Sequence, residues 1–433
     1  MIKNSIYALV IISFLGNWLA DRNIIPAQLT VISEIIIFSL FIYSHFYRSV
    51  KINKYSYDKI LYFAFFVLCS IISCIVNSWY SIQMLYSLRL ILRFYVFYLA
   101  LINIELKDID IKRINNFLLF IFLIQLPISA INFYFYGVDE KTHGIHGRGG
   151  GLTTIIPLVM IGYLSGYYIF YKKSKKLLVI STLFILYGII GAKAALMYIY
   201  PLAFLVLYYL AFIKGRNVYL LRHLIIIILL ISSSFSVSSL IIKYNPRLNP
   251  ERKVGGTIDY NYAYWYTKEY TTARDKENPS ITHGRYSTSK VALQTMLNES
   301  PINLLLGFGP GALTPSIFGY QINHKVKNLS KSYGITGLIY IWTEYGLFGV
   351  VIVLIIFIKF LLDGMDWFKY EKDPYYKSFA FGSIFFTVFN ILIFITYNKL
   401  PIAGDIIPLL FFYCMAVMYL KTRKNRLTTS SKH

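Results

Sequence analysis

The sequence predicts an all-α polytopic membrane protein with about twelve transmembrane helices and one long loop outside the membrane. Hydrophobic residues make up 57% of the 433 residues, and the mean hydropathy of +0.56 excludes an ordinary soluble domain. Apolar runs recur along nearly the whole chain, and each approaches the roughly 20 residues that a helix needs to cross about 30 Å of hydrocarbon. The net charge of +23 is distributed between these runs, which argues against a nucleic-acid-binding surface.

Twelve apolar runs are the predicted helices. They span roughly 5–19, 29–46, 59–78, 84–104, 115–137, 153–171, 177–191, 194–213, 221–243, 334–358, 376–396 and 404–420. Asn17, Trp18 and Arg22 occupy the place where a signal peptide would be cleaved, so we expect the first run to remain as a membrane helix. The three cysteines lie inside apolar runs and indicate neither a disulfide framework nor a thiolate metal site.

Basic residues predict the orientation of these helices. If the N-terminus is inside, the cytoplasmic segments hold more than half of the 43 Lys and Arg residues. The short outward loops hold only Arg22, Lys141, Arg148, Lys193 and Lys399. This asymmetry follows the positive-inside rule and predicts that both termini are cytoplasmic and that any chemistry takes place at the outer face.

Residues 244–333 form the long outward loop. This loop separates nine predicted helices in 1–243 from three in 334–420, and a basic cytoplasmic tail follows at 421–433. Loops of this length are translocated largely regardless of charge, and a long segment within a compact protein is usually functional or disordered. The aromatic cluster at 259–270 and the amphipathic helix pattern at 287–300 favour order.

Three cations near the outer ends of predicted helices are candidate ligands for an anion. Arg89 and Arg93 lie four residues apart, and so on one face of the fourth helix. An arginine at membrane depth costs at least about 2.5 kcal/mol, which indicates a cavity or ligand role, with snorkelling to the headgroups as the alternative. Lys193, in GAKAALMYIYP, lies where small residues allow a tight outer turn, and an ordinary interfacial lysine is its alternative.

Two further arginines stand beside predicted helix starts. Arg148 occupies HGIHGRGGGLTT, where successive glycines let a ligand approach the backbone and free amides at a helix start favour an anion. Arg285 stands just ahead of 287–300, where the helix macrodipole disfavours a cation unless both share an anion. A flexible loop and a plain surface charge are the respective alternatives. The histidines and carboxylates within 139–146 lack the spacing of a metal motif, so we expect no metal and no other cofactor.

Two patterns in the long loop are open to a functional interpretation. Tyr260, Tyr262, Tyr264 and Tyr266 alternate at period two. In an extended segment their four rings would share one face, which suits sugar rings or the headgroup layer. GFGPGA at 307–312 has the form of a dinucleotide fingerprint, but no strand precedes it, so we expect a tight turn that folds the loop back toward the membrane.

The last third of the chain carries a family pattern. HGRYSTSKVALQTMLNESPINLLLGFGPGA at 283–312 is followed by IWTEYGLFGVV at 341–351. This resembles Wzy-type O-antigen polymerases and the related WaaL-type ligases, in which an outward Arg opens a short helix, a Pro and a Gly-x-Gly follow, and a Glu-x-Gly-x-x-Gly helix comes next. Glu344, Gly346 and Gly349 fill that last element. RGGG at 148–151 and GAKAAL at 191–196 resemble the family's Arg-Gly outer loop and Gly-Ser-Arg motif.

The resemblance implies a metal-independent glycosyltransferase of the GT-C class in the bacterial inner membrane. It implies that a growing glycan moves from undecaprenyl pyrophosphate to an incoming lipid-linked repeat unit at the periplasmic face, with a flippase and a chain-length regulator as candidate partners. Arg148 and Arg285 would hold the donor pyrophosphate, while Arg89, Arg93 and Lys193 would guide or bind the lipid pyrophosphates.

The resemblance leaves two alternatives open. A ligase would transfer finished glycan to lipid A core, but the His that ligases carry ahead of the Glu is replaced here by KSYG with Ser332. The general base would then be either His324 or His283. A lipid-linked oligosaccharide flippase would also need cations facing a cavity, but the chain shows no repeat of the kind that transporters often carry.

Overall fold

Every regular element that the structure describes is helical. The computed structural model describes residues 2–22, 24–26, 31–46, 54–79, 82–104, 106–139, 142, 144–145, 151–213, 220–273, 284–313, 323–332, 334–397 and 406–430. Within these ranges the chain forms α-helices, π-helical turns and one short 3-10 helix, and it forms no strand. The all-α class expected from the sequence is therefore confirmed for this part of the chain.

The helices before residue 245 coincide with the apolar runs predicted there. They are α1 (Ile2–Ile11), η1 (Ile12–Gly16), α2 (Asn17–Asp21), α3 (Ile32–Phe46), α4 (Lys54–Val76), α5 (Ile82–Ile104), α6 (Asp108–Tyr136), α7 (Leu152–Gly166), η4 (Tyr167–Tyr171), α8 (Lys175–Ile190), α9 (Leu196–Tyr208), η5 (Tyr209–Ile213) and α10 (Leu220–Tyr244). The π-helical turn η1 joins α1 to α2, and η4 and η5 continue α7 and α9, so each of these three predicted runs is one continuous helix.

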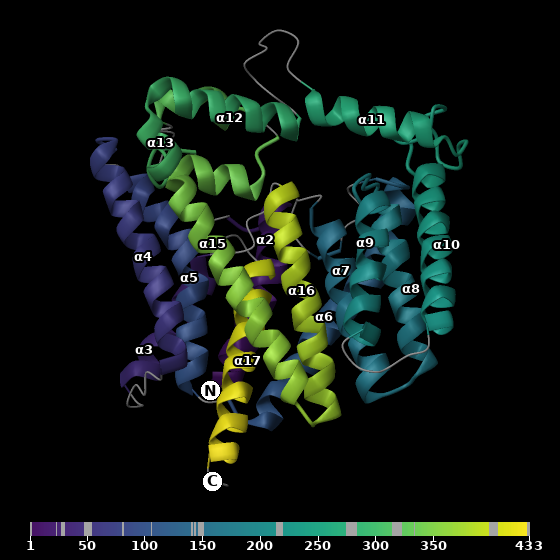
Figure 1. Ribbon diagram of the computed structural model, residues 1–433, viewed down its shortest axis with the longest axis horizontal. Helices are drawn as coiled ribbons and strands as arrows, with labels where there is room; N and C mark the ends of the chain where they lie inside the picture. The colour runs from purple at the N-terminus through teal and green to yellow at the C-terminus, as the bar shows by residue number, and fades with distance from the viewer. Residues whose placement is uncertain are drawn as a thin grey trace.

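The long segment after α10 is folded and lies at one end of the helical bundle. It contains α11 (Tyr260–Thr272), α12 (Arg285–Glu299), α13 (Pro301–Leu306), η6 (His324–Val326) and α14 (Lys327–Ser330). Figure 1 shows α11 and α12 lying across that end of the bundle, while both chain termini lie at the opposite end. The helix predicted at 287–300 is thus observed as α12, and its buried residues Ala292 and Met296 join the apolar cluster beneath it.

Three helices complete the bundle, namely α15 (Gly337–Tyr370), α16 (Pro374–Thr396) and α17 (Ile406–Ser430). Small residues let α16 approach α7 closely. A Cβ atom added at Gly162 would collide with the ring of Phe385, and one at Gly166 would lie 2.6 Å from the carbonyl oxygen of Ser378. The most apolar window of each of these two helices is 72% buried, so the pair α7 and α16 forms the centre of the core.

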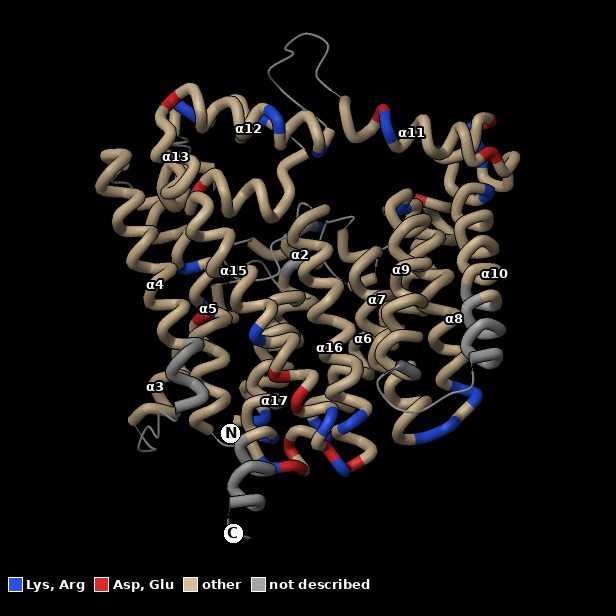
Figure 2. Tube along the Cα trace, viewed as in Figure 1, with Lys and Arg blue, Asp and Glu red and all other residues tan. Residues whose placement is uncertain are grey.

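The lengths and charges of the helices fit a multi-pass membrane protein. Six helical segments among the described residues are long and apolar enough to cross a membrane, namely Ile2–Ala20, Ile82–Ile104, Asp108–Tyr136, Leu152–Tyr171, Gly337–Tyr370 and Pro374–Thr396. Other apolar helices are shorter; α3, with 15 residues, measures about 22 Å against about 30 Å of hydrocarbon. Figure 2 shows that charged residues gather at the two ends of the bundle and that the band between carries few. The count of twelve spans remains a prediction.

Candidate functional site

Arg285 is the first residue of α12, at the end of the bundle opposite the termini. Its guanidinium lies over the ring of Tyr397, 4.6 Å from the centroid. The preceding residue, Gly284, donates its amide to the carbonyl oxygen of Ala273 at 2.8 Å. A Cβ atom at Gly284 would collide with the carbonyl group of Thr271, so only glycine permits this approach. The start of α12 is therefore fixed both to the segment after α11 and to Tyr397.

Tyr397 joins the starts of two more helices to Arg285. Its hydroxyl lies 3.0 Å from the Oγ1 atom of Thr154, in the first turn of α7. Its carbonyl oxygen accepts a hydrogen bond of 2.7 Å from the amide of Gly337, the first residue of α15. The tyrosine is only 4% exposed, so these contacts are enclosed. The side chain of Tyr397 thus connects Arg285 to the first turn of α7.

The turn that carries Lys193 packs against the same helix start. Gly151 is the N-cap of α7 and supplies no side-chain hydrogen bond to the first turn. A Cβ atom at Gly191, in the turn between α8 and α9, would lie 3.0 Å from the Cβ atom of the buried Thr153. Lys193 follows in this turn and is half-buried. Arg148 lies outside the described residues, three positions before Gly151 in the sequence.

His324 lies at the far end of α12 from Arg285. It is an exposed residue at the start of η6, and the Nζ atom of its neighbour Lys325 lies 3.2 Å from Oε2 of Glu299, the last residue of α12. Because α12 has 15 residues, its two ends are separated by about 21 Å. The structure therefore does not bring His324 to Arg285. His283 lies outside the described residues, as do both histidines of the 139–146 segment.

Arg89 and Arg93 of α5 both contact Glu34 of α3. The Nη1 atom of Arg93 lies 2.9 Å from Oε1 of Glu34, and the Nε atom of Arg89 lies 3.4 Å from Oε2. Glu34 is 5% exposed and Arg93 is 9% exposed, so this is a buried ion-pair group. Sequence reasoning missed Glu34, although it is the single acidic residue in the run 29–46 and such residues usually have a partner. Pyrophosphate binding by the two arginines stays a prediction.

The expected extended face of four tyrosines is wrong, because this segment is the helix α11. The carboxylate of Asp259 accepts the amide of Tyr262 at 2.9 Å and so caps the helix. Residues two apart in a helix point about 200° apart, so the rings are divided between two faces. Tyr264 is 65% exposed and Tyr260 is 37% exposed. Tyr266 is partly buried, and this burial raises the pKa of its hydroxyl. Only the two exposed tyrosines keep the open face that sugar contact requires.

Glu344, from the Glu-x-Gly-x-x-Gly element, holds the turn after α13 against α15. Its carboxylate is fully buried and accepts hydrogen bonds from the hydroxyl of Ser87 at 2.7 Å and from the amides of Gly311 and Leu313 at 2.9 Å each. The amide of Gly309 also donates to the carbonyl oxygen of Glu344 at 3.1 Å. The tight turn predicted at 307–312 is therefore observed, with Glu344 as its anchor.

Gly346, the next residue of that element, interrupts α15. Its φ of 68° and ψ of −172° are essentially restricted to glycine, and a Cβ atom there would collide with the carbonyl group of Leu305 in α13. Gly307, with a φ of 70°, packs in return against the backbone between Glu344 and Gly346. The glycines therefore let α13 and α15 pack backbone against backbone.

No family model, curated protein or solved structure matches the chain. Within the described ranges, no group of three or more His, Cys, Asp or Glu side chains is placed to hold a metal ion. The candidate functional site is therefore the region around Arg285 and Tyr397, together with the start of α7 and the turn that carries Lys193. Tyr397 is a second site residue that the sequence did not predict, because nothing in the sequence distinguishes it from the other tyrosines among the 39 in the chain.

Proposed function

We propose that the chain is a membrane glycosyltransferase that polymerises undecaprenyl pyrophosphate-linked repeat units at the outer membrane face. The resemblance of 283–312 and 341–351 to Wzy-type polymerases motivates this choice. One observation supports it most: Arg285 stacks on Tyr397, whose hydroxyl contacts the first turn of α7, directly after RGGG at 148–151. Arg285 is thus connected to the helix start that directly follows RGGG in the sequence, although the two motifs are far apart in the sequence.

A pyrophosphate suits this arrangement. A guanidinium is planar, and one that lies over an aromatic ring can still use the N–H donors at its edge to bind phosphate oxygens in pairs. The start of α7 adds backbone amides and a positive helix end, and the turn that carries Lys193 packs against that start. The guanidinium and the helix start both favour an anion on this side of the bundle.

The proposed reaction uses this positive charge to stabilise the leaving group. The bond between the sugar C1 atom and the phosphate oxygen breaks, and its electron pair passes to the pyrophosphate held by Arg285 and Arg148. The acceptor hydroxyl oxygen forms the new bond to C1 and gives its proton to a base. We exclude His324 from this step because it lies at the far end of α12. His283, two positions before Arg285 in the sequence, remains the candidate.

The test is complementation of a strain that lacks the polymerase. Arg285→Ala should reduce the ladder of long glycans to single repeats, and Arg285→Lys should restore it only in part, because lysine keeps the charge without the planar set of donors. Lys290→Ala is the matched control, since Lys290 is an exposed cation on the same helix. A full ladder from Arg285→Ala at normal expression would refute the proposal.

A reaction with purified components separates the alternatives. A defined lipid-linked repeat as the only substrate should be converted to longer lipid-linked chains by a polymerase. Transfer that occurs only when lipid A core is added would indicate the ligase, and movement of the lipid across vesicles without transfer would indicate the flippase. Either result would replace the proposed polymerase activity.

A further inference from the structure

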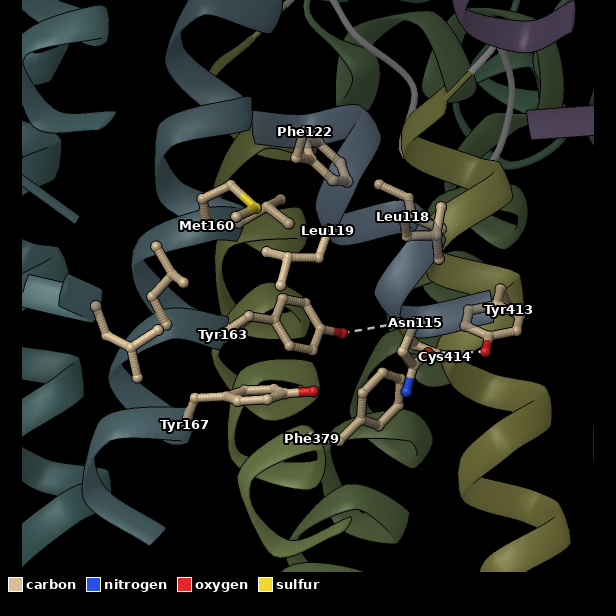
Figure 3. A pocket seen from close by; sticks show the side chains of 14 residues that line it. Asn115, Leu118, Leu119, Phe122, Met160, Tyr163, Tyr167, Phe379, Tyr413 and Cys414 are labelled. Atoms are coloured by element: carbon tan, nitrogen blue, oxygen red, sulfur yellow. Dashed lines mark hydrogen bonds between the residues drawn. The ribbon is translucent and has the colours of Figure 1, made fainter. Parts of the chain in front are cut away.

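A cavity lies in the half of the bundle that is nearer the termini, away from Arg285. It has a volume of about 70 Å³ and is lined by α6, α7, η4, α8, α16 and α17. Figure 3 shows the rings of Phe122, Tyr163, Tyr167 and Phe379 around it. Nothing in the proposed glycosyl transfer uses this space, which therefore requires its own explanation.

The polar atoms of the cavity wall bond to one another. The hydroxyl of Tyr413 donates to Oδ1 of Asn115 at 2.8 Å, and Nδ2 of Asn115 donates to the hydroxyl of Tyr375 at 3.1 Å. The hydroxyl of Tyr163 lies 2.9 Å from the Sγ atom of Cys414. A buried water needs two to four polar partners, and this wall offers mainly hydrocarbon and ring surface. The chemistry of the wall thus favours an apolar occupant.

α6 is a much more exposed wall of the cavity than α7. Only 28% of the most apolar window of α6 is buried, compared with 72% for α7. Leu119, Tyr167 and Leu177 line the cavity and are partly exposed, so it opens at the surface of the bundle. Wall atoms beside an empty gap lose their dispersion contacts, and in a membrane the molecules at hand to restore them are lipid chains. An acyl chain is therefore the natural occupant.

Cations beside the opening of the cavity favour a lipid with an anionic headgroup. Leu177 of the cavity wall directly follows four exposed lysines, which are Lys172, Lys173, Lys175 and Lys176. α8 begins at Lys175, its N-cap residue Ser174 makes no side-chain cap hydrogen bond, and its first turn has no acidic residue. Cations at a helix start oppose the helix dipole unless an anion lies between them. A phosphate group at this place would satisfy both the lysines and the amides.

We propose that this cavity holds a short part of an acyl chain of an anionic phospholipid from the leaflet on the side of the termini, and that the rest of the chain lies along the surface of the bundle. The phosphate of this lipid lies at the start of α8, on Lys175 and Lys176. The lipid occupies the gap beside α6 and so adds contacts between this exposed helix and the core. The lipid site shares no residue with the site around Arg285, which lies at the other end of the bundle.

Photolabelling of the purified full-length chain in detergent tests where the acyl chain lies. Phosphatidylglycerol with a diazirine in its acyl chain should label peptides from 115–122 and 159–167, and excess phosphatidylglycerol should suppress the label. Leu119→Trp should fill the cavity and reduce labelling at least tenfold. Phe120→Trp is the matched control, because Phe120 is 57% exposed and does not line the cavity. Equal labelling in both variants would overturn the proposal.

Competition tests the headgroup. Since each lysine near an anionic lipid contributes about fivefold in affinity, Lys175→Gln with Lys176→Gln should weaken phosphatidylglycerol binding by about 25-fold. Lys372→Gln, an exposed lysine in the turn between α15 and α16, should leave it unchanged. Competition by phosphatidylcholine as strong as that by phosphatidylglycerol would refute the anionic headgroup. Competition by undecaprenyl phosphate alone would assign the cavity to the lipid carrier instead.

Discussion

Glu344 offers the sharpest test of how the segment after α13 is attached to the helices of the bundle. We predict that Glu344→Gln releases the turn at 307–313 from α15 without unfolding the bundle. The carboxylate accepts hydrogen bonds from the hydroxyl of Ser87 and from the amides of Gly311 and Leu313. Glutamine has the same shape, but its amide nitrogen cannot accept a hydrogen bond. The three donors that now share two carboxylate oxygens would then have only one oxygen as an acceptor.

The expected loss follows from these contacts. A buried amide left without its acceptor costs about 1 to 3 kcal/mol, and a hydrogen bond to a charged group contributes about 1.5 to 3 kcal/mol. On either measure the turn should lose about 1.5 to 3 kcal/mol. Because 1.4 kcal/mol corresponds to a factor of ten, amide protection at Gly311 or Leu313 should fall at least about tenfold.

Hydrogen exchange with mass spectrometry measures this loss directly. Peptides covering 307–313 should exchange faster in Glu344→Gln, while peptides from α16 keep their protection. Glu299→Gln is the control, since Glu299 makes an exposed pair with Lys325 that contributes about 0 to 1 kcal/mol. Unchanged exchange at 307–313 would refute the reasoning, and equal loss in α16 would show that the effect is not local.

Three further substitutions test other contacts. Glu34→Gln removes the carboxylate that Arg93 contacts and should lower stability by about 3 to 5 kcal/mol, so an unchanged thermal midpoint in detergent would contradict the buried ion-pair group. Gly346→Ala should cost about 1 to 3 kcal/mol from backbone strain alone, whereas Gly364→Ala in the same helix adds no strain at positive φ and should cost less in the same assay. Asp259→Ala should cost α11 about 1 kcal/mol, seen as faster amide exchange over 260–272 with no change in α12.

The helices were predictable because each is specified by a local pattern. Apolar runs of membrane length and the breaks between them placed the bundle helices, and the spacing of apolar residues placed α12. The tyrosine segment failed because alternation alone cannot distinguish a strand from a helix with aromatic residues on two faces. Its outcome depends on the cap at Asp259 and on the burial of Ala263, which is the single buried residue in α11.

The candidate site was only partly predictable, because its partners come from distant parts of the chain. Arg285 was found from its place ahead of a helix, but its contact with Tyr397 depends on how α16 ends beneath α12. His324 was a candidate because it lies ahead of Glu344 in the sequence, as the His of the ligases does. The structure shows instead that its neighbour Lys325 pairs with Glu299 at the far end of α12. A one-dimensional pattern contains no information about that placement.

α7 connects the two sites that we propose. Its first turn contacts Tyr397 beneath Arg285, and its last turns line the cavity at the other end of the bundle. Gly162 and Gly166 press its backbone against α16, so the two helices have little freedom to slide past each other. A lipid that fixes the last turns of α7 would therefore also fix the helix start that we assign to the pyrophosphate. Any such coupling acts in both directions, since a donor that favours one position of α7 must favour the lipid by the same factor.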